Sequence, residues 1–357
     1  MIQHRRNLII LAAILLLLTS VCRVPLVNQV RVSFQLLFQI SVALMLVYCI
    51  WCVGNRWLAG ILFLATFSCF YPRLSSESFF TFQLIVFGAM WYLVLVFSLK
   101  SRWKTILLDA MCVIALCNIL YQVSQSFGYD FIYRDIGNSS AIRTPGLMSN
   151  RAEMSALLAF CLPAFFRKGW AWLIPLVIGG FINTRVFGGA AAGFAASMVY
   201  LFKFERKWIG YISVVGAILG GVAFFTLIEG SDLSRLKAWN LAWDLYKHNW
   251  IFGFGLGHWQ IIFGDEAMRF YFTAPFAQAH NDLLQGVFEM GIGFAVLTVG
   301  YFVSIIRRIN KRAILSLAAM AGIVVNSLVN FPFHIAITAM VAITWMAILE
   351  NDLRKSH

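Results

Sequence analysis

Long apolar segments recur along the whole chain of 357 residues, with only short polar loops between most of them. Hydrophobic residues make up 61% of the sequence, charged residues make up 12%, and the mean hydropathy is +0.80. Soluble globular domains usually contain about 25% charged residues. An apolar run of about 20 residues can cross a bilayer as a helix. The composition therefore predicts an all-α, polytopic membrane protein.

Twelve segments are predicted to be transmembrane helices, some of them short or tilted. Residues 170–202 could also form one long helix, but Arg185 and the pair Gly188-Gly189 favour a hairpin at that point. We expect a single integral membrane domain over residues 1–357. The predicted spans are 8–22, 32–53, 57–71, 79–99, 105–127, 151–166, 170–184, 187–202, 208–229, 281–305, 313–329 and 333–349.

Lys and Arg are distributed unevenly between alternate loops. The loops on one side hold most of the 28 basic residues, including Arg5-Arg6, Arg167-Lys168 and Arg307-Arg308. Cytoplasmic loops carry the excess of positive charge, so both termini are predicted to be cytoplasmic. This topology accounts for the net charge of +13 without a nucleic-acid partner. The two long loops, 128–150 and 230–280, are then external, and loops of this length are usually functional.

The second external loop is predicted to contain a helix that lies in the membrane interface. Asp232-Leu233-Ser234 has the polar residues that favour a helix start. Four aromatic residues then recur on one face at helical spacing, as suits the headgroup level, namely Trp239, Trp243, Tyr246 and Trp250. The run Gly253-Phe254-Gly255-Leu256-Gly257 ends the helix. It follows no strand and lacks the Lys-Ser/Thr of a phosphate-binding loop, so it is predicted to form a tight turn.

Ionisable residues gather where this loop meets a predicted membrane helix. His280 and Asp282 lie in Ala279-His280-Asn281-Asp282-Leu283-Leu284-Gln285, and Glu289 follows about two turns into the helix. Such groups are costly in lipid and are functional candidates by default. The structural alternatives are a helix start capped by Asn281 with Asp282 in its first turn, and a structural ion pair of Glu289 with an arginine.

Several motifs between about residues 140 and 340 occur in an order that is similar to a known family. They are Arg143-Thr144-Pro145-Gly146-Leu147-Met148-Ser149-Asn150, Asn183-Thr184-Arg185, Ser234-Arg235 through Trp239, Gly253-x-Gly255-x-Gly257, Ala279 to Gln285 with Glu289-x-Gly291-x-x-Phe294, and Ser327-Leu328-Val329-Asn330-Phe331-Pro332-Phe333-His334. Together they resemble the signature of the O-antigen ligase and polymerase family of bacterial surface-polysaccharide enzymes. The chain departs from that family at two places. Asn330 stands where the family often has Asp, and Ile251-Phe252 replaces the usual Pro before the Gly-rich turn.

The chemistry expected at the external face is glycan transfer from a polyprenyl diphosphate. Nucleotide sugars are cytoplasmic, so an activated glycan outside the membrane is expected on such a carrier. Arginine suits a departing diphosphate because its donors form a fixed fork. Histidine suits removal of the acceptor's proton because its pKa lies near the working pH. The predicted site residues are the diphosphate-binding Arg185, Arg235 and Arg143, the base His280, and the supporting Asp282, Glu289 and Asn330.

No cofactor is expected at this site. The external side lacks a closely spaced Asp-x-Asp or His/Cys cluster, so no metal is implied. Structural roles compete with the functional ones, because Arg185 could instead extend to the interface. His248, His258 and His334 are predicted to be packing or interface residues.

The resemblance implies a GT-C-like glycosyltransferase of the bacterial inner membrane with a periplasmic active site. Ligation of the glycan to a lipid A core is the first expectation. Polymerisation onto a growing glycan, or transfer to a protein, would use the same groups. The rival from another class is a secondary transporter or glycolipid flippase, which would show inverted repeats and ionisable residues at the bilayer midplane. No internal repeat is visible in the sequence.

Overall fold

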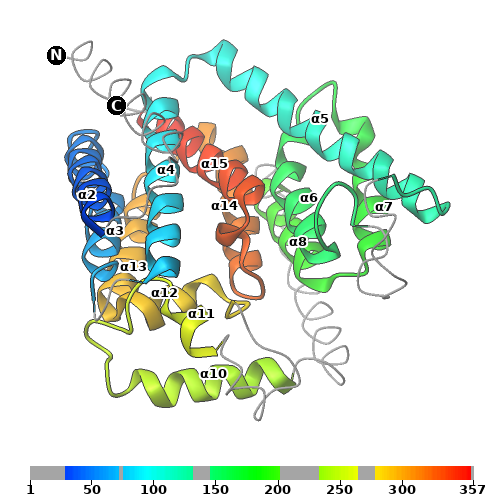
Figure 1. Ribbon diagram of the computed structural model, residues 1–357. Helices are drawn as coiled ribbons and strands as arrows, with labels where there is room; N and C mark the ends of the chain where they lie inside the picture. Colours follow the sequence, from blue (N-terminus) through cyan, green and yellow to red (C-terminus); the bar gives the residue numbers. More distant parts are fainter. Residues whose placement is uncertain (1–28, 72–74, 132–144, 202–232, 264–277, 355–357) are drawn as a thin grey trace. The chain divides into compact units, whose positions relative to one another are not determined.

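The computed structural model describes residues 29–71, 75–131, 145–201, 233–263 and 278–354, and all regular structure in these ranges is helical, as predicted (Figure 1). The chain divides into two compact units. Unit 1 comprises Met1–Ser98, Lys237–Gln278 and Leu283–Arg308, and unit 2 comprises Leu99–Leu236, Ala279–Asp282 and Ile309–His357.

The helices of unit 1 are α2 (Gln29–Cys52), α3 (Arg56–Ser68), α4 (Ser76–Ser98), α11 (His258–Phe263) and α13 (Ile292–Ile306). Two further helices, α10 (Leu233–Tyr246) and α12 (Asp282–Met290), begin with residues of unit 2 and continue in unit 1. Helix α3 packs against α2, α4 and α13. Glycines allow α3 and α13 to approach closely, because Gly60 faces Leu297 and Gly300 faces the ring of Trp57.

The helices of unit 2 are α5 (Ser101–Ser126), α6 (Arg151–Phe165), η1 (Ala171–Leu173), α7 (Ile174–Thr184), α8 (Phe187–Leu201), η4 (Lys311–Ala313), α14 (Ile314–Ser327), η5 (Pro332–His334) and α15 (Ala336–Arg354). Helix α6 forms the core, since it packs against α5, α7, α8, α14 and α15 and is buried from Met154 to Phe165. The small residues of α8 let it lie close to α6 and α14, with Gly189 directly against Ser155. Trp345 is fully buried, and its indole N–H donates to the Phe160 carbonyl at 2.8 Å.

Three described helices are long and apolar enough to cross a membrane, namely Glu77–Ser98, Ser101–Ser126 and Ala336–Arg354. A fourth span results if the bent pair Ile292–Ile306 and Lys311–Ser327 counts as one. The other apolar stretches, Ile40–Cys52, Arg56–Ser68, Ala171–Thr184 and Phe187–Leu201, have 10–17 residues each, so the prediction of twelve spans is not confirmed. The predicted spans 8–22 and 208–229 lie outside the described residues. The chain is nonetheless a helical protein with several helices suited to a bilayer.

The residues 170–202 do not form one long helix, because α7 ends at Thr184 and α8 begins at Phe187, as the prediction of a break near Arg185 requires. The predicted single helix over 281–305 is wrong, because the chain breaks at Gly291 between α12 and α13. Gly291 has a φ of 72°, and a Cβ on it would overlap the carbonyl of Ile251. Glycine adopts this left-handed conformation without steric cost, which permits the break.

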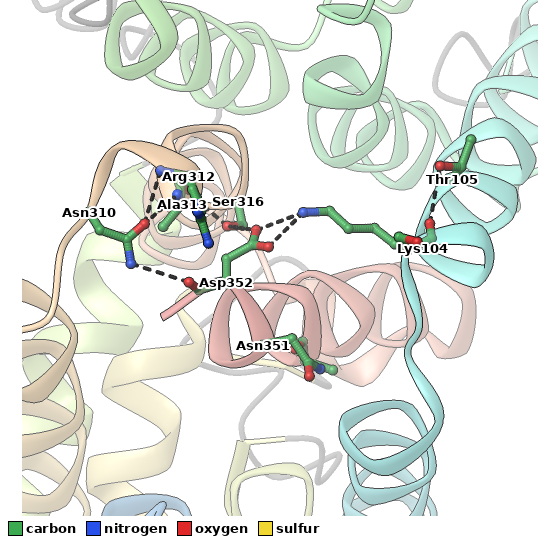
Figure 2. A network of polar contacts seen from close by, with 10 residues as sticks. Lys104, Thr105, Asn310, Arg312, Ala313, Ser316, Asn351 and Asp352 are labelled. Atoms are coloured by element: carbon green, nitrogen blue, oxygen red, sulfur yellow. Dashed lines mark hydrogen bonds and ion pairs between the residues drawn. The ribbon is translucent and has the colours of Figure 1, made fainter. Parts of the chain in front are cut away.

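A buried polar network joins three elements of unit 2 (Figure 2). The Lys104 ammonium near the start of α5 donates to both carboxylate oxygens of Asp352 in α15, at 2.7 and 2.8 Å. Ser316 of α14 donates to the same carboxylate at 3.1 Å, and Asn310 donates to the Asp352 carbonyl at 3.2 Å. These bonds satisfy a carboxylate that is only 5% exposed, and a buried charge needs such partners.

Candidate functional site

The turn between α7 and α8 places Arg185 in an unusual backbone conformation. Arg185 follows the last residue of α7 with φ 52° and ψ 33°, and its N–H donates to the Ile182 carbonyl at 3.2 Å. Glycine is the common residue at such a helix end. A side chain in this left-handed region costs about 1–2 kcal/mol. Arg185 is exposed, so packing of its side chain does not explain the conformation.

His280 has the same conformation, with a φ of 52° immediately before α12. Within the ranges that the structure describes, Arg185 and His280 are the only residues other than glycine with a positive φ. Residues held in such conformations concentrate at functional sites. One of the three arginines predicted to bind the diphosphate, Arg185, and the predicted base, His280, therefore have this strained backbone.

The ring of His280 is partly buried against Phe331. The two ring centroids lie 4.7 Å apart, and the planes are nearly perpendicular at 79°. Burial, and secondarily the positive charge of Arg235, lower the pKa of His280 from 6.5 to about 4. His280 is therefore a neutral imidazole at pH 7. The same effect shows that Arg235, in the first turn of α10, lies close enough for its charge to act on the ring.

Asp282, the first residue of α12, binds the segment that contains η5. Its Oδ1 accepts a hydrogen bond from Nδ1 of His334 at 2.9 Å, and its Oδ2 accepts the Phe333 backbone N–H at 3.1 Å. The Asp282 residue is only 8% exposed. Because His280 contacts Phe331, residues 280–282 and 331–334 lie side by side. Both histidines are thus carried by one pair of adjacent segments.

Asn330 connects this pair of segments to α6. Its Nδ2 donates to the Ala152 carbonyl at 3.4 Å, and its Oδ1 accepts the Phe331 N–H at 3.0 Å. One turn further along α6, the Ser155 hydroxyl donates to the carbonyl of Val186, the residue after Arg185. The Arg185 turn and the Asn330 segment therefore both lie against the first two turns of α6. This arrangement gathers Arg185, Asn330 and the residues around His280 in unit 2.

The end of the loop 128–150 is anchored beside the start of α6. The backbone N–H and carbonyl of Gly146 bond to the amide of Gln125 at 2.8 and 3.2 Å, and the N–H of Leu147 donates to Asn118 at 3.1 Å. Asn150 then caps α6 by accepting the N–H of Glu153 at 3.0 Å. Position 143 of the same motif lies outside the described residues, so the role predicted for Arg143 stays a prediction.

Glu289 lies in unit 1, where its carboxylate organises the Gly-rich turn. It is 2% exposed, and its oxygens accept the backbone N–H groups of Gly257 at 2.9 Å and Trp259 at 3.3 Å and the Gln285 amide at 3.0 Å. These contacts suit a structural role at the start of α11. The supporting role predicted for Glu289 beside the arginines stays a prediction.

The Gly-rich run is the tight turn predicted from the sequence. Gly253, Gly255 and Gly257 have φ values of 71°, 96° and 74°. The N–H groups of Phe254 and Gly255 donate to the carbonyls of Phe288 and Glu289 at 2.9 and 2.8 Å. The last carbonyls of a helix lack partners within it. The N–H groups of the turn therefore pair with carbonyls at the end of α12 that have no partner within the helix.

The contact between His334 and Asp282 could not be predicted from the sequence, which indicates His334 only as a packing or interface residue. The two residues are 52 positions apart, and nothing in either motif indicates that they bind each other. Among the described residues, no group of three or more His, Cys, Asp or Glu is arranged to hold a metal ion.

No protein-family model matches the chain, and a search of the curated proteins found no match.

Proposed function

We propose that the protein is a membrane glycosyltransferase that moves a glycan from a polyprenyl diphosphate to an acceptor hydroxyl. The observation that carries this proposal is that the charge of Arg235 acts on the ring of His280, which lies two residues before the buried Asp282. Arg185 belongs to the same compact unit. A cation and an imidazole are groups that such a transfer needs. The strained backbone at Arg185 and His280 supports it, because packing of the exposed Arg185 side chain does not account for that conformation.

Arg185 and Arg235 are the proposed diphosphate ligands, with Arg143 as a third. When the bond between the sugar's anomeric carbon and the phosphate oxygen breaks, the electron pair stays on the diphosphate. Guanidinium groups stabilise that charge through two parallel hydrogen bonds. Asp282 and Asn330 support this site by fixing the segments on which the histidines lie.

A histidine of the site takes the proton of the acceptor hydroxyl, and His280 is the base predicted from the sequence. Its lowered pKa keeps it neutral at pH 7, which is the form that a base requires. A bound diphosphate would offset the charge of Arg235, which is the smaller of the two causes of the lowered pKa of His280, and burial would remain.

The finer assignment follows the family resemblance. We propose a GT-C-like protein of about twelve spans in the bacterial inner membrane, with the site on the periplasmic face. The donor is a polyprenyl diphosphate-linked glycan and the first-choice acceptor is a lipid A core. A growing glycan, as in a polymerase, or a protein hydroxyl are the alternative acceptors.

Reconstitution of the full chain in liposomes tests this function. A polyprenyl diphosphate-linked oligosaccharide is supplied alone, with lipid A core, or with an acceptor protein, and the products are separated by gel electrophoresis. We expect transfer that survives excess EDTA and is lost in Arg185→Ala and Arg235→Ala. Lys at either position should restore little, because a point charge does not replace the guanidinium fork.

Arg102→Ala is the matched control, since this exposed arginine of α5 is predicted to lie at the cytoplasmic end. The number and kind of products distinguish ligation from polymerisation. Movement of the intact glycolipid across the bilayer without transfer would instead identify the transporter or flippase. EDTA-sensitive transfer that divalent ions restore would contradict binding by arginines alone.

A further inference from the structure

The two histidines of the site have opposite charge partners. His280 lies within the field of the Arg235 guanidinium, whereas His334 is hydrogen-bonded to the carboxylate of Asp282 at 2.9 Å. A neighbouring cation opposes the positive charge that an imidazole gains when it takes a proton, and a neighbouring carboxylate favours it. The surroundings therefore suit His280 to an anionic ligand and His334 to proton uptake.

The geometry points to His334, positioned by Asp282, as the group that takes the proton of the acceptor hydroxyl. This inference rests on the proposed glycan transfer and assigns one of its steps. In the step, the acceptor oxygen bonds to the anomeric carbon while the bond from that carbon to the diphosphate oxygen breaks. The hydroxyl proton passes to Nε2 of His334, and the electron pair of the broken bond leaves with the diphosphate.

Asp282 fixes the form of His334 that this step requires. A carboxylate only accepts hydrogen bonds, so Nδ1 of His334 carries the hydrogen and donates it to Oδ1. The proton-accepting lone pair is then on Nε2. Oδ2 is held by the backbone N–H of Phe333 at 3.1 Å, which sets the orientation of the whole carboxylate. The orientation of the imidazole thus follows from two bonds to one buried side chain.

The exposure of Asp282 and His334 agrees with the role of Asp282 in positioning and of His334 in proton transfer. The Asp282 side chain is 7% exposed, whereas the His334 side chain is 21% exposed. His280 lies two residues before Asp282 and contacts Phe331, three residues before His334. The donor-side imidazole and the acceptor-side imidazole are therefore presented by the same two segments.

The variant Asp282→Asn tests the dyad. The asparagine can keep its oxygen on the Phe333 N–H and turn its amide nitrogen towards Nδ1 of His334. That arrangement retains both hydrogen bonds but moves the imidazole hydrogen to Nε2, where the ring can no longer accept a proton. We expect kcat for transfer in liposomes to fall by about 100-fold to 10,000-fold, the range for loss of a general base. The KM for the donor and the thermal midpoint of the purified protein should change little.

His334→Gln provides a second test, because its amide can still donate to Asp282 but does not take a proton. It should show the same loss of kcat. His280→Asn should raise the KM for the donor more than it lowers kcat. His248→Gln, an exposed histidine beyond the end of α10, is the control and should behave as wild type.

The outcomes separate this inference from the proposed function. Normal turnover by a folded Asp282→Asn or His334→Gln protein overturns the dyad and leaves the transferase proposal standing. A fall in kcat confined to His280→Asn returns the base to His280. Loss of folded protein in both dyad variants also overturns the inference, since it shows a structural pair. Absence of transfer by the wild-type protein overturns the proposed function itself, and the dyad with it.

Discussion

Arg185 and His280 share one left-handed backbone conformation, each with a φ of 52°, although one follows α7 and the other precedes α12. A side chain in this region costs about 1–2 kcal/mol, and glycine avoids that cost. Neither position is occupied by glycine, so the backbone conformation of each residue costs stability that a glycine would not. This cost can be measured directly.

Replacement of Arg185 should affect stability and donor binding in different ways. Arg185→Gly should leave the free energy of unfolding unchanged or raise it by up to about 1 kcal/mol, because glycine adopts this φ freely. Arg185→Val should lower it by about 1 kcal/mol or more, since a β-branched residue is a true outlier there. Both should lose donor affinity. Thermal unfolding in detergent and binding of a polyprenyl diphosphate check this pair, and a valine variant as stable as the glycine variant would contradict it.

The pH dependence of stability should report the buried imidazole. In the unfolded chain His280 binds a proton near pH 6.5, whereas in the folded protein its pKa is about 4. Between these values the unfolded state binds more protons, so the free energy of unfolding falls as the pH falls from 6.5 to 4. The free energy of unfolding of the wild type, relative to that of His280→Asn, should therefore fall as the pH falls from 6.5 to 4. Thermal midpoints measured across it provide the test, with the exposed His248→Asn as the control.

If the difference in thermal midpoint between wild type and His280→Asn stays constant from pH 7 to pH 4, the histidine has the same pKa in the folded and the unfolded protein. Arg235→Gln adds a second comparison. It removes the smaller of the two causes of the shift, so the pKa of His280 should rise part of the way towards 6.5. Burial, the larger cause, should remain.

The fold could be predicted from the sequence where the pattern is local. The apolar runs predicted the helices, and the charge and glycines at 185–189 predicted the break that separates α7 from α8. The break at Gly291 could not be predicted, because an apolar run of that length reads as one span. The cause is remote, since Ile292 donates its N–H to the Trp250 carbonyl at 2.8 Å and the Ile251 carbonyl occupies the space beside Gly291.

The site shows the same limit. Residue type and placement indicated His280, Arg185 and Asp282 as candidates. Their partners come from elsewhere in the chain, and nothing in the sequence near Asp282 indicates that His334 binds it. Glu289 is a further example. The sequence indicated that its carboxylate would be costly to bury, but it did not indicate that the backbone N–H groups of Gly257 and Trp259 would bind it.

The Lys104–Asp352 pair should contribute strongly to the stability of unit 2 (Figure 2). Lys104→Met leaves a carboxylate that is 5% exposed without its counter-ion, which should cost about 2–4 kcal/mol. The double variant Lys104→Met/Asp352→Leu should regain much of that loss, because no charge is then buried. Lys247→Met is the matched control, since its pair with Asp244 is exposed and should contribute less than about 1 kcal/mol. Unfolding in detergent measures all three, and a double variant no more stable than Lys104→Met would contradict the argument.

Asn330→Asp should reduce the amount of folded protein, even though the related family often has Asp at this position. Asn330 is 4% exposed and donates Nδ2 to the Ala152 carbonyl at 3.4 Å. A carboxylate places an acceptor against that carbonyl, and an unsatisfied buried group costs about 1–3 kcal/mol. Asn351→Asp is the matched control, because Asn351 makes the same kind of bond to the Ala347 carbonyl at 3.0 Å but is partly exposed, so its loss should be smaller. The yield of detergent-extracted protein and its transfer activity, measured together, show whether Asn330→Asp reduces folding. A well-folded Asn330→Asp protein with raised transfer would show that the site accepts the family's carboxylate and that the bond to α6 is dispensable.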